Sequence, residues 1–273
     1  MTIARITPTS GQLTIFWGDG DSTVVAAGDL ANHAHAYAGA GTWTITATPA
    51  SRITQLRIFD PLLSGFHSAQ LRGNAMTDFL CSGLGNAVAS VIDSADMVAW
   101  PSPNWILSSM PAGGTYSINS TDMAAWTPTL WWLYTMPAGT YNIDTSDMVA
   151  WSPDSLSLYS MPAGTYTFAA GIMANWTRAS SILVHSLLDG GVNLTQADVD
   201  GILLDVYGSL ATRVVINGII NVGGTNPAPS GVFQAAAACP VGALTPGKEI
   251  ANELLNDGCA TGGNTWAFVI FTP

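Results

Sequence analysis

The chain has 273 residues, which is enough for one or two domains whose core needs no disulfide or metal to hold it together. Only 9% of the residues are charged, and the formal net charge of −11 results from 7 Lys and Arg against 18 Asp and Glu. So few basic residues exclude an extended phosphate-binding surface and argue against nucleic acid as a partner.

The first 50 residues predict a small β-domain. Leu13, Ile15 and Trp17 alternate with other residues, and a second alternation follows over Trp43–Ala47, as in strands with two different faces. Gly18-Asp-Gly20 is a tight turn after the first strand. His33, His35 and Asp19 are candidate metal ligands here, because neutral imidazoles and carboxylates bind metal ions.

Three short motifs carry a family resemblance in the same segment: Trp17-Gly-Asp-Gly20, His35-Ala-Tyr37 and Gly41-Thr-Trp43. They resemble the motif of the immunoglobulin-like PKD family, although the first strands of that fold are missing. The resemblance implies that His35 and Asp19 bond the turn backbone, an interpretation we favour over a metal site. Residues 1–50 are thus expected to form a truncated PKD-like β-domain or an N-terminal cap.

The chain then repeats itself. An Asp-Met-x-Ala-Trp motif ends at Trp100, Trp126 and Trp151, with a degenerate copy at Trp176, in steps of 26, 25 and 25 residues. A Met-Pro-Ala-Gly motif recurs at Met110, Met136 and Met161, and an apolar column follows the same spacing at Leu56, Cys81, Leu107, Leu133, Leu158 and Leu183. A fixed period in the range of about 20–50 residues indicates stacked repeats that bury their apolar faces on each other.

Each repeat contains one run typical of a strand: Trp105–Met110, Leu130–Met136, Leu156–Met161 and Ile182–His185. One such strand per turn of this length predicts a mainly β protein with a leucine-rich-repeat-like β-solenoid over residues 51–188, in about five turns from Ile53 to Leu188. The usual Asn of the leucine-rich-repeat consensus is missing. The Trp100, Trp126, Trp151 and Trp176 column is expected in the core.

Residues 189–273 predict an α/β cap. Thr195 is the expected N-cap of a helix over Leu194–Tyr207, with Val199, Ile202, Leu203 and Val206 buried. Strands are expected at 214–216, 219–222 and 266–271, and a short helix at 248–255. The Leu-Thr-x-x-x-Val helix start and the loop Gly223–Ser230 resemble C-terminal caps of leucine-rich-repeat proteins from phage tail-fibre genes and bacterial surfaces, which implies a virion- or cell-surface protein.

Acidic residues recur near the start of each return segment, at Asp93, Asp96, Asp122, Asp144 and Asp147. Stacked carboxylates repel each other unless something compensates them. Calcium, which takes 6–8 oxygen ligands, is one alternative. Hydrogen bonding to backbone N–H groups at turns is the other, which we favour because it needs no ion. No other cofactor is expected.

The strand face supplies the candidate binding residues. Trp105, Trp131 and Leu156 share the alternation of the apolar column and are expected to point inward. The opposite set, Ile106, Trp132, Ser157, Ser108, Tyr134, Tyr159 and Val184, is then expected on the open face. Exposed aromatic rings mark interaction sites. Trp132, Tyr134 and Tyr159 therefore predict a surface that binds a glycan or a neighbouring subunit.

The three cysteines allow one bridge, Cys239–Cys259, in an oxidising compartment, with Cys81 as a small buried residue. Residues 1–7 lack the features of a secretory signal peptide, and no apolar run is long enough for a transmembrane helix.

We expect a non-catalytic structural or binding protein of a virion appendage or extracellular surface fibre, which assembles with copies of itself or other surface proteins or attaches to a cell-surface glycan. The alternative is a solenoid polysaccharide lyase or hydrolase. It is disfavoured because a repeated column offers many equivalent acids rather than a distinct catalytic pair.

Overall fold

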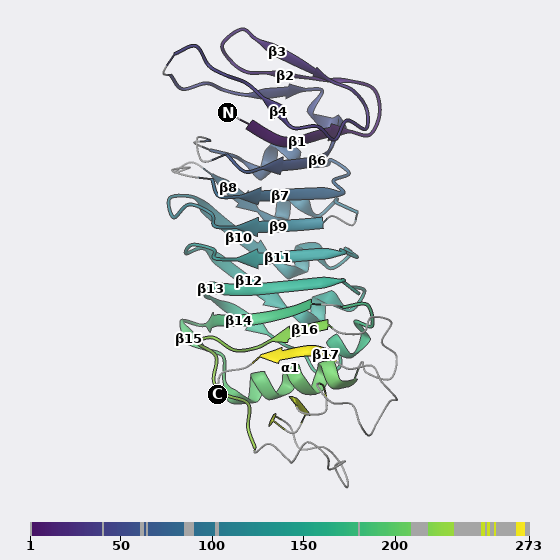
Figure 1. Ribbon diagram of the computed structural model, residues 1–273, viewed down its shortest axis with the longest axis vertical. Coiled ribbons are helices and arrows are strands. Elements are labelled where there is room, and N and C mark those ends of the chain that lie inside the picture. Colours follow the sequence, from purple (N-terminus) through teal and green to yellow (C-terminus); the bar gives the residue numbers. More distant parts are fainter. Residues whose placement is uncertain are drawn as a thin grey trace.

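The computed structural model describes residues 2–39, 41–60, 63, 65–84, 90–101, 104–179, 181–208, 218–231, 247–248, 250–251, 254 and 266–270. The molecule is mainly β (Figure 1): a long, curled and mostly parallel sheet, a small antiparallel sheet at the N-terminal end and the helix α1 (Gln196–Gly208) at the C-terminal end. The predicted class, a mainly β chain built from repeats, is confirmed at this level.

The strands of the main sheet follow one another in chain order and lie side by side down the length of the molecule (Figure 1). They are β6 (Ile53–Ile58), β7 (Asp78–Ser82), β9 (Asn104–Ser108), β11 (Leu130–Tyr134), β13 (Ser155–Thr167), β14 (Ser181–Asp189), β16 (Gly218–Asn221) and β17 (Trp266–Ile270). Each pairs in parallel with the next. The return path of each repeat therefore runs outside the main sheet, as parallel pairing requires.

That return path contains a second strand and a 3-10 helix. The second strands β8 (Val91–Asp93), β10 (Thr115–Asn119) and β12 (Thr140–Asp144) pair in parallel with each other and with the C-terminal half of β13. The helices are η2 (Ser68–Leu71), η3 (Ser94–Met97), η4 (Ser120–Met123), η5 (Thr145–Met148) and η6 (Met173–Asn175). The prediction of one strand per repeat is therefore wrong. The alternation in the Thr-Tyr-x-Ile segment of the return path is sufficient to form a second strand.

At the N-terminal end, β1 (Thr2–Pro8) pairs antiparallel with β6 on one side and with β4 (His33–Ala34) on the other. Strands β2 (Leu13–Phe16), β3 (Ser22–Val25) and β5 (Thr46–Thr48) form the separate antiparallel sheet, and η1 (Ala50–Arg52) leads into β6. The edge of the parallel sheet is therefore covered by the chain's own first strand, which removes an open template for aggregation.

At the C-terminal end, the hairpin strand β15 (Val192–Asn193) leads into α1. Thr195 Oγ1 accepts the backbone N–H of Asp198 at 3.2 Å, while the Asp198 carboxylate accepts the Thr195 backbone N–H at 2.8 Å. This reciprocal pair confirms Thr195 as the cap. The predicted buried face is also confirmed: Val199, Ile202, Leu203 and Val206 are buried. The predicted strand at 214–216 lies outside the described residues, as do Cys239 and Cys259 with their proposed bridge.

The core lies between the two rows of strands and the 3-10 helices. It contains the predicted Trp column, Trp100, Trp126, Trp151 and Trp176, and a second column of strand residues that includes Trp105 and Trp131. Trp100 stacks on Trp126 at 6.0 Å between ring centroids, and Trp105 stacks on Trp131 at 5.5 Å. Like residues thus pack on like residues from one repeat to the next, which is what a fixed period demands.

The predicted apolar column is correct in the middle repeats, but at both ends other residues occupy the predicted positions. Leu107 pairs with Cys81 and Leu133, and Leu133 with Leu158, as predicted. The residue that continues the column from Leu158 is Val184, and the one before Cys81 is Ile58. Assigning Leu56 and Leu183 to this column was therefore wrong, and so was placing Val184 on the open face, because the end repeats are not 25 residues long.

A backbone corner lies directly after β9 and β11 and within β13 and β14. Ser109, Thr135, Ser160 and Ser186 have φ between 49° and 53°, in the left-handed region that side chains other than glycine rarely adopt. At this corner the Ser109 N–H donates to the Tyr134 carbonyl at 3.2 Å, and the Thr135 N–H to the Tyr159 carbonyl at 2.9 Å. The strained residue thus continues the hydrogen bonding between repeats past the end of the strand, which offsets its conformational cost.

Cys81 is fully buried in the apolar column, as predicted, and burial raises the pKa of its thiol. None of the helices in the described part of the chain has the length and apolar character needed to cross a membrane.

Candidate binding surface

Successive side chains along the main-sheet strands point alternately into the core and to the outer face. Trp105, Leu107, Trp131, Leu133, Leu156 and Leu158 are buried in the core, which confirms the predicted inward set. The outward set forms two rows across the strands: Arg57, Leu80, Ile106, Trp132, Ser157 and Leu183, and Ser82, Ser108, Tyr134, Tyr159 and His185. Ile106, Ser108 and Ser157 are buried within these rows, so the prediction that they lie exposed on the open face is wrong. The strand register thus brings the predicted residues Trp132, Tyr134 and Tyr159 to neighbouring positions on one surface.

Trp132 is held in a fixed orientation on this surface. Its indole Nε1–H donates to Ser155 Oγ on the neighbouring strand at 2.8 Å, and the ring meets Tyr134 edge to face at 6.5 Å. The ring is half-buried, and Ser157 beside it in the same row is buried. The Trp132 ring thus keeps one orientation beside a small, buried neighbour.

Tyr159 is the most exposed ring of the group, at 38% of its surface, and stacks on His185 with ring centroids 4.6 Å apart. Burial lowers the pKa of His185, so the imidazole stays neutral at neutral pH. His185 Nδ1 also lies 2.9 Å from Ser186 Oγ. The sequence analysis does not identify His185 because it assigns Val184, one residue earlier, to this position on the outer face.

The charged residues of this face lie at its N-terminal end. Arg57 and Asp78 form an ion pair there, with 3.0 Å between Arg57 Nη2 and Asp78 Oδ1, and the Asp78 side chain is largely buried. The rows from Ile106 to Leu183 and from Ser108 to His185 contain no Lys, Arg, Asp or Glu. The aromatic part of the surface is thus neutral, and its contacts depend on apolar burial and hydrogen bonding.

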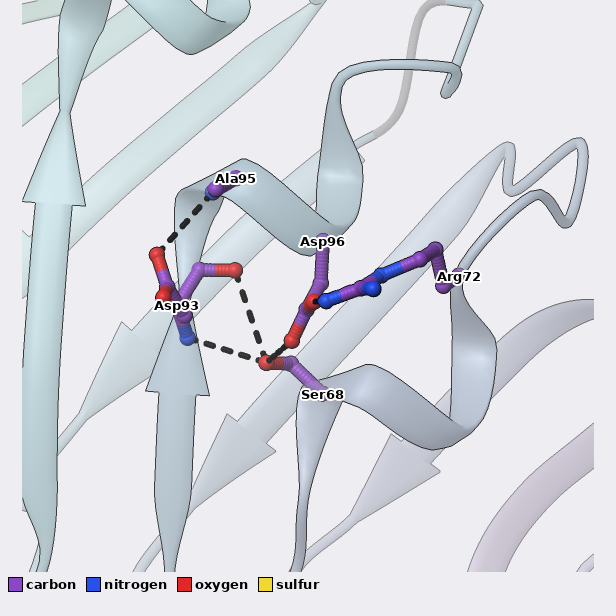
Figure 2. A network of polar contacts seen from close by, with 5 residues as sticks. All are labelled: Ser68, Arg72, Asp93, Ala95 and Asp96. Carbon is purple, nitrogen blue, oxygen red and sulfur yellow. Dashed lines mark hydrogen bonds and ion pairs between the residues drawn. The ribbon is translucent and has the colours of Figure 1, made fainter.

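The acidic residues lie on the return path, at the 3-10 helices (Figure 2). Ser68 Oγ donates to Asp96 Oδ2 at 2.6 Å and accepts the Asp93 backbone N–H at 2.9 Å, while Arg72 Nε donates to Asp96 Oδ1 at 2.9 Å. The Asp93 carboxylate accepts the Ala95 N–H at 3.1 Å and thereby caps η3. Each carboxylate of this repeat therefore has donors from the protein itself.

The next two repeats copy this arrangement. Ser94 Oγ donates to Asp122 and Ser120 Oγ to Asp147, each at 2.5 Å, and each hydroxyl accepts the backbone N–H of the following repeat at 2.9 Å. Asp144 caps η5 through the Ser146 N–H at 2.8 Å. Asp93 and Asp144 thus accept backbone N–H groups, as the favoured alternative requires, whereas Asp96, Asp122 and Asp147 accept hydrogen bonds from Ser hydroxyl groups of the preceding repeat. Calcium binding at these residues stays a prediction to be tested with a chelator.

Replacing Asp96 by Asn should flatten the dependence of stability on pH below about pH 4. Desolvation raises the pKa of Asp96, but hydrogen bonds from Ser68 and Arg72 outweigh it and leave the pKa lowered. A carboxyl with a lowered folded-state pKa stabilises the fold above its unfolded value, about 3.9, and loses this contribution as pH falls through the folded value. Denaturant unfolding from pH 2 to 7 measures the effect. Arg72→Gln should give an intermediate slope, and an unchanged slope in Asp96→Asn would contradict the assignment.

A second cluster of candidate ligands lies in the N-terminal segment. His35 Nε2 is 2.6 Å from Asp19 Oδ2, Asp19 accepts the Asp21 N–H at 3.2 Å, and His35 stacks on Trp17 at 5.1 Å. The hydrogen bond from His35 lowers the pKa of Asp19. The ligand atoms of Asp19, Asp21 and His35 lie within 4.8 Å of each other, whereas His33 is buried on β4 and belongs to no such group. The structure therefore does not bring together the candidate metal set of His33, His35 and Asp19.

Asp19 thus bonds the turn backbone, as the resemblance implies, whereas the hydrogen bond of His35 is to the Asp19 carboxylate. Tyr37 Oη donates to the Trp17 carbonyl at 2.9 Å, and Trp17 Nε1–H donates to Thr23 at 2.9 Å. The turn, the histidine and the tyrosine thus hold one another in place.

Comparisons with known proteins add no further constraint: no family model matches the chain, and neither a curated protein nor a solved structure matches it.

Proposed function

We propose that this chain is a non-catalytic structural and binding protein of an extracellular fibre or virion appendage, and that the aromatic part of the main-sheet face is its contact surface. In this proposal residues 51–188 are a leucine-rich-repeat-like solenoid that serves as a rigid support, with a PKD-like segment at one end and an α/β cap at the other. The single observation that supports a contact role is the neutral aromatic surface of Trp132, Tyr134 and Tyr159 on regular strands.

The chemistry of the surface favours a neutral, hydroxyl-rich ligand such as a glycan. Trp132 offers a ring whose orientation is fixed by Ser155, and Tyr159 offers a second ring one strand away. The phenol groups of Tyr134 and Tyr159 and the imidazole of His185 supply hydrogen bonds without charge. Sites on regular elements hold their side chains more precisely than sites on loops, because packing fixes the rotamers.

Replacing Trp132, Tyr134 and Tyr159 together by Ser should leave the fold intact and abolish binding or assembly. All three side chains lie outside the core cluster, so their loss removes contact area rather than core. Far-ultraviolet circular dichroism and thermal unfolding check the fold, a glycan panel checks attachment, and size-exclusion chromatography with light scattering checks assembly.

The matched control is the triple replacement of Thr115, Thr140 and Thr165, which occupy exposed positions on the second row of strands. This variant should bind and assemble like the wild type. Loss of glycan binding alone in the aromatic variant supports attachment, and loss of the oligomer alone supports a subunit interface. Wild-type behaviour in both assays would contradict the proposal, as would release of products from polysaccharides by the wild-type chain, which would favour the enzyme class.

A further inference from the structure

Two arginines lie opposite each other at the N-terminal end of the main-sheet face. Strands β1, β6 and β7 run side by side there (Figure 1), and Arg5 on β1 is the direct partner of Arg57 on β6. Ile6 and Leu56, the next pair along, belong to the core, so both arginines point to the outer face. Side chains opposite each other in an antiparallel ladder have Cβ atoms about 4.5–5.5 Å apart, and like charges in this position are destabilising.

Among the described residues, one carboxylate compensates these two charges. Asp78 on β7 is buried and forms its ion pair with Arg57. None of the ion pairs in the described part of the chain includes Arg5. Asp29, whose backbone carbonyl accepts the Thr7 hydroxyl at 2.5 Å on the other side, uses its own carboxylate to accept the Ala31 N–H. The charge of Arg5 is therefore not balanced by a neighbouring side chain.

Two polar atoms beside this charge are buried and unpaired. Arg5 Nε and Gln55 Oε1 are both shielded from solvent and form no hydrogen bond. Gln55 is the direct partner of Thr7, so it lies diagonal to Arg5 on the same face, within reach of a long side chain. Buried polar groups nearly always have a hydrogen-bond partner, so two unpaired ones next to an unbalanced charge indicate a ligand. The Gln55 amide can turn its N–H group to the same side, because only hydrogen bonds fix its orientation.

We propose that Arg5, with Arg57 and Gln55 beside it, binds a single oxyanion, a carboxylate or a sulfate group. The planar guanidinium matches two oxygens of such a group, and hydrogen bonds between charged partners are the strong ones. Arg57 donates to Asp78 through Nε and Nη2, and its Nη1 is left to face the same anion. A site for one group agrees with a chain that has too few basic residues for an extended anionic partner.

Sodium sulfate tests the proposal on the full chain. Sulfate should raise the midpoint of thermal unfolding in a saturable way, at constant ionic strength with chloride as the replaced anion, since a ligand that binds only the folded state stabilises it. Titration calorimetry should give one sulfate per chain. The general stabilising effect of sulfate on buried surface does not saturate, which separates it from binding.

Glucuronate and glucose identify the source of the anion. Tighter binding of glucuronate than of sulfate would assign the site to a carboxylate, such as that of an acidic sugar, and the reverse order would assign it to a sulfate group. Glucose, which has the ring without the charge, should give no effect. Equal binding of glucose and glucuronate would overturn the proposal, because the site would then not recognise charge.

Arg5→Met removes the charge and keeps an apolar stem. Sulfate affinity should fall roughly tenfold or more, the range for a lost hydrogen bond to a charged group. Without sulfate the variant should be at least as stable as the wild type, because a pair of like charges and an unpaired buried atom are both lost. Arg178→Met is the matched control, since Arg178 is an exposed arginine that pairs with Asp154. If Arg5→Met does not fold, Gln55→Leu, which retains both arginines, should also weaken the affinity.

The proposal is independent of the function proposed for the aromatic surface. The triple Ser variant of Trp132, Tyr134 and Tyr159 should therefore bind sulfate like the wild type, and loss of sulfate binding in it would place the anion on the aromatic surface instead. Two further results would overturn the proposal. One is the absence of saturable binding of sulfate and glucuronate to the wild type, which would mean that Arg5 is only hydrated. The other is undiminished affinity in a folded Arg5→Met or Gln55→Leu variant.

Discussion

Replacing Leu133 by Ala should lower the free energy of unfolding by about 2–5 kcal/mol, the range measured for buried leucines that lose their side chain to a cavity. Leu133 is completely buried and lies between Leu107 and Leu158 in the apolar column. Its neighbours belong to parallel strands fixed on both sides, so the structure has little freedom to collapse into the space. Urea unfolding monitored by circular dichroism measures the change.

Leu130→Ala is the matched control, because Leu130 begins the same strand on the opposite, outer face and is only half-buried. Its loss should cost clearly less than that of Leu133. Equal losses of unfolding free energy in the two variants would mean that the inward and outward sets of β11 are wrongly assigned. The proposed contact surface, which depends on this assignment, would then also be wrong.

The period of the sequence was sufficient to predict the central repeats. A spacing of 25 or 26 residues between Trp126 and Trp151, or between Leu133 and Leu158, fixes which residues stack, and alternation within a strand then fixes which side chains face the core. The outward positions of Trp132, Tyr134 and Tyr159 follow from the period and this alternation. The predicted fold class and surface both depended on it.

The ends of the array were less predictable, because register there is set by tertiary contacts rather than by the period. Leu183 satisfies the 25-residue spacing from Leu158, yet Val184 occupies the core position and His185 reaches the outer face. A slip of one residue turns every side chain to the other face of a strand. Ser181 and His185 favour the observed register, since placing Leu183 inward would turn both polar side chains into the core, but the 25-residue spacing points to the other register.

Features that depend on backbone geometry were also missed. The left-handed corner at Thr135 carries a β-branched residue, which argues against such a conformation when only the sequence is considered. The second strands β10 and β12 begin at the Thr of a Gly-Thr pair, where the sequence analysis predicts no strand.

Replacing Gly139 by Ala should destabilise the protein by about 1–3 kcal/mol, the usual cost of forcing extra atoms into a packed interior. A Cβ at this position would lie 2.7 Å from the carbonyl oxygen of Tyr116 and 3.0 Å from its Cβ, in the preceding repeat. Gly139 is not among the glycines with positive φ, so the cost is steric and comes from the distance between repeats. The glycine of the Met-Pro-Ala-Gly motif is therefore explained by backbone approach rather than by turn conformation.

Gly201→Ala is the control, because Gly201 lies in α1 with no atom within 4 Å of an added Cβ. That variant should be more stable by about 0.5–1 kcal/mol, the difference between alanine and glycine within a helix. Gly164→Ala should behave like Gly139→Ala, since its Cβ would approach the Tyr141 carbonyl oxygen to 2.9 Å one repeat further on. Thermal unfolding of the three variants compares them directly, and a stable Gly139→Ala would show that adjacent repeats lie further apart than this packing requires.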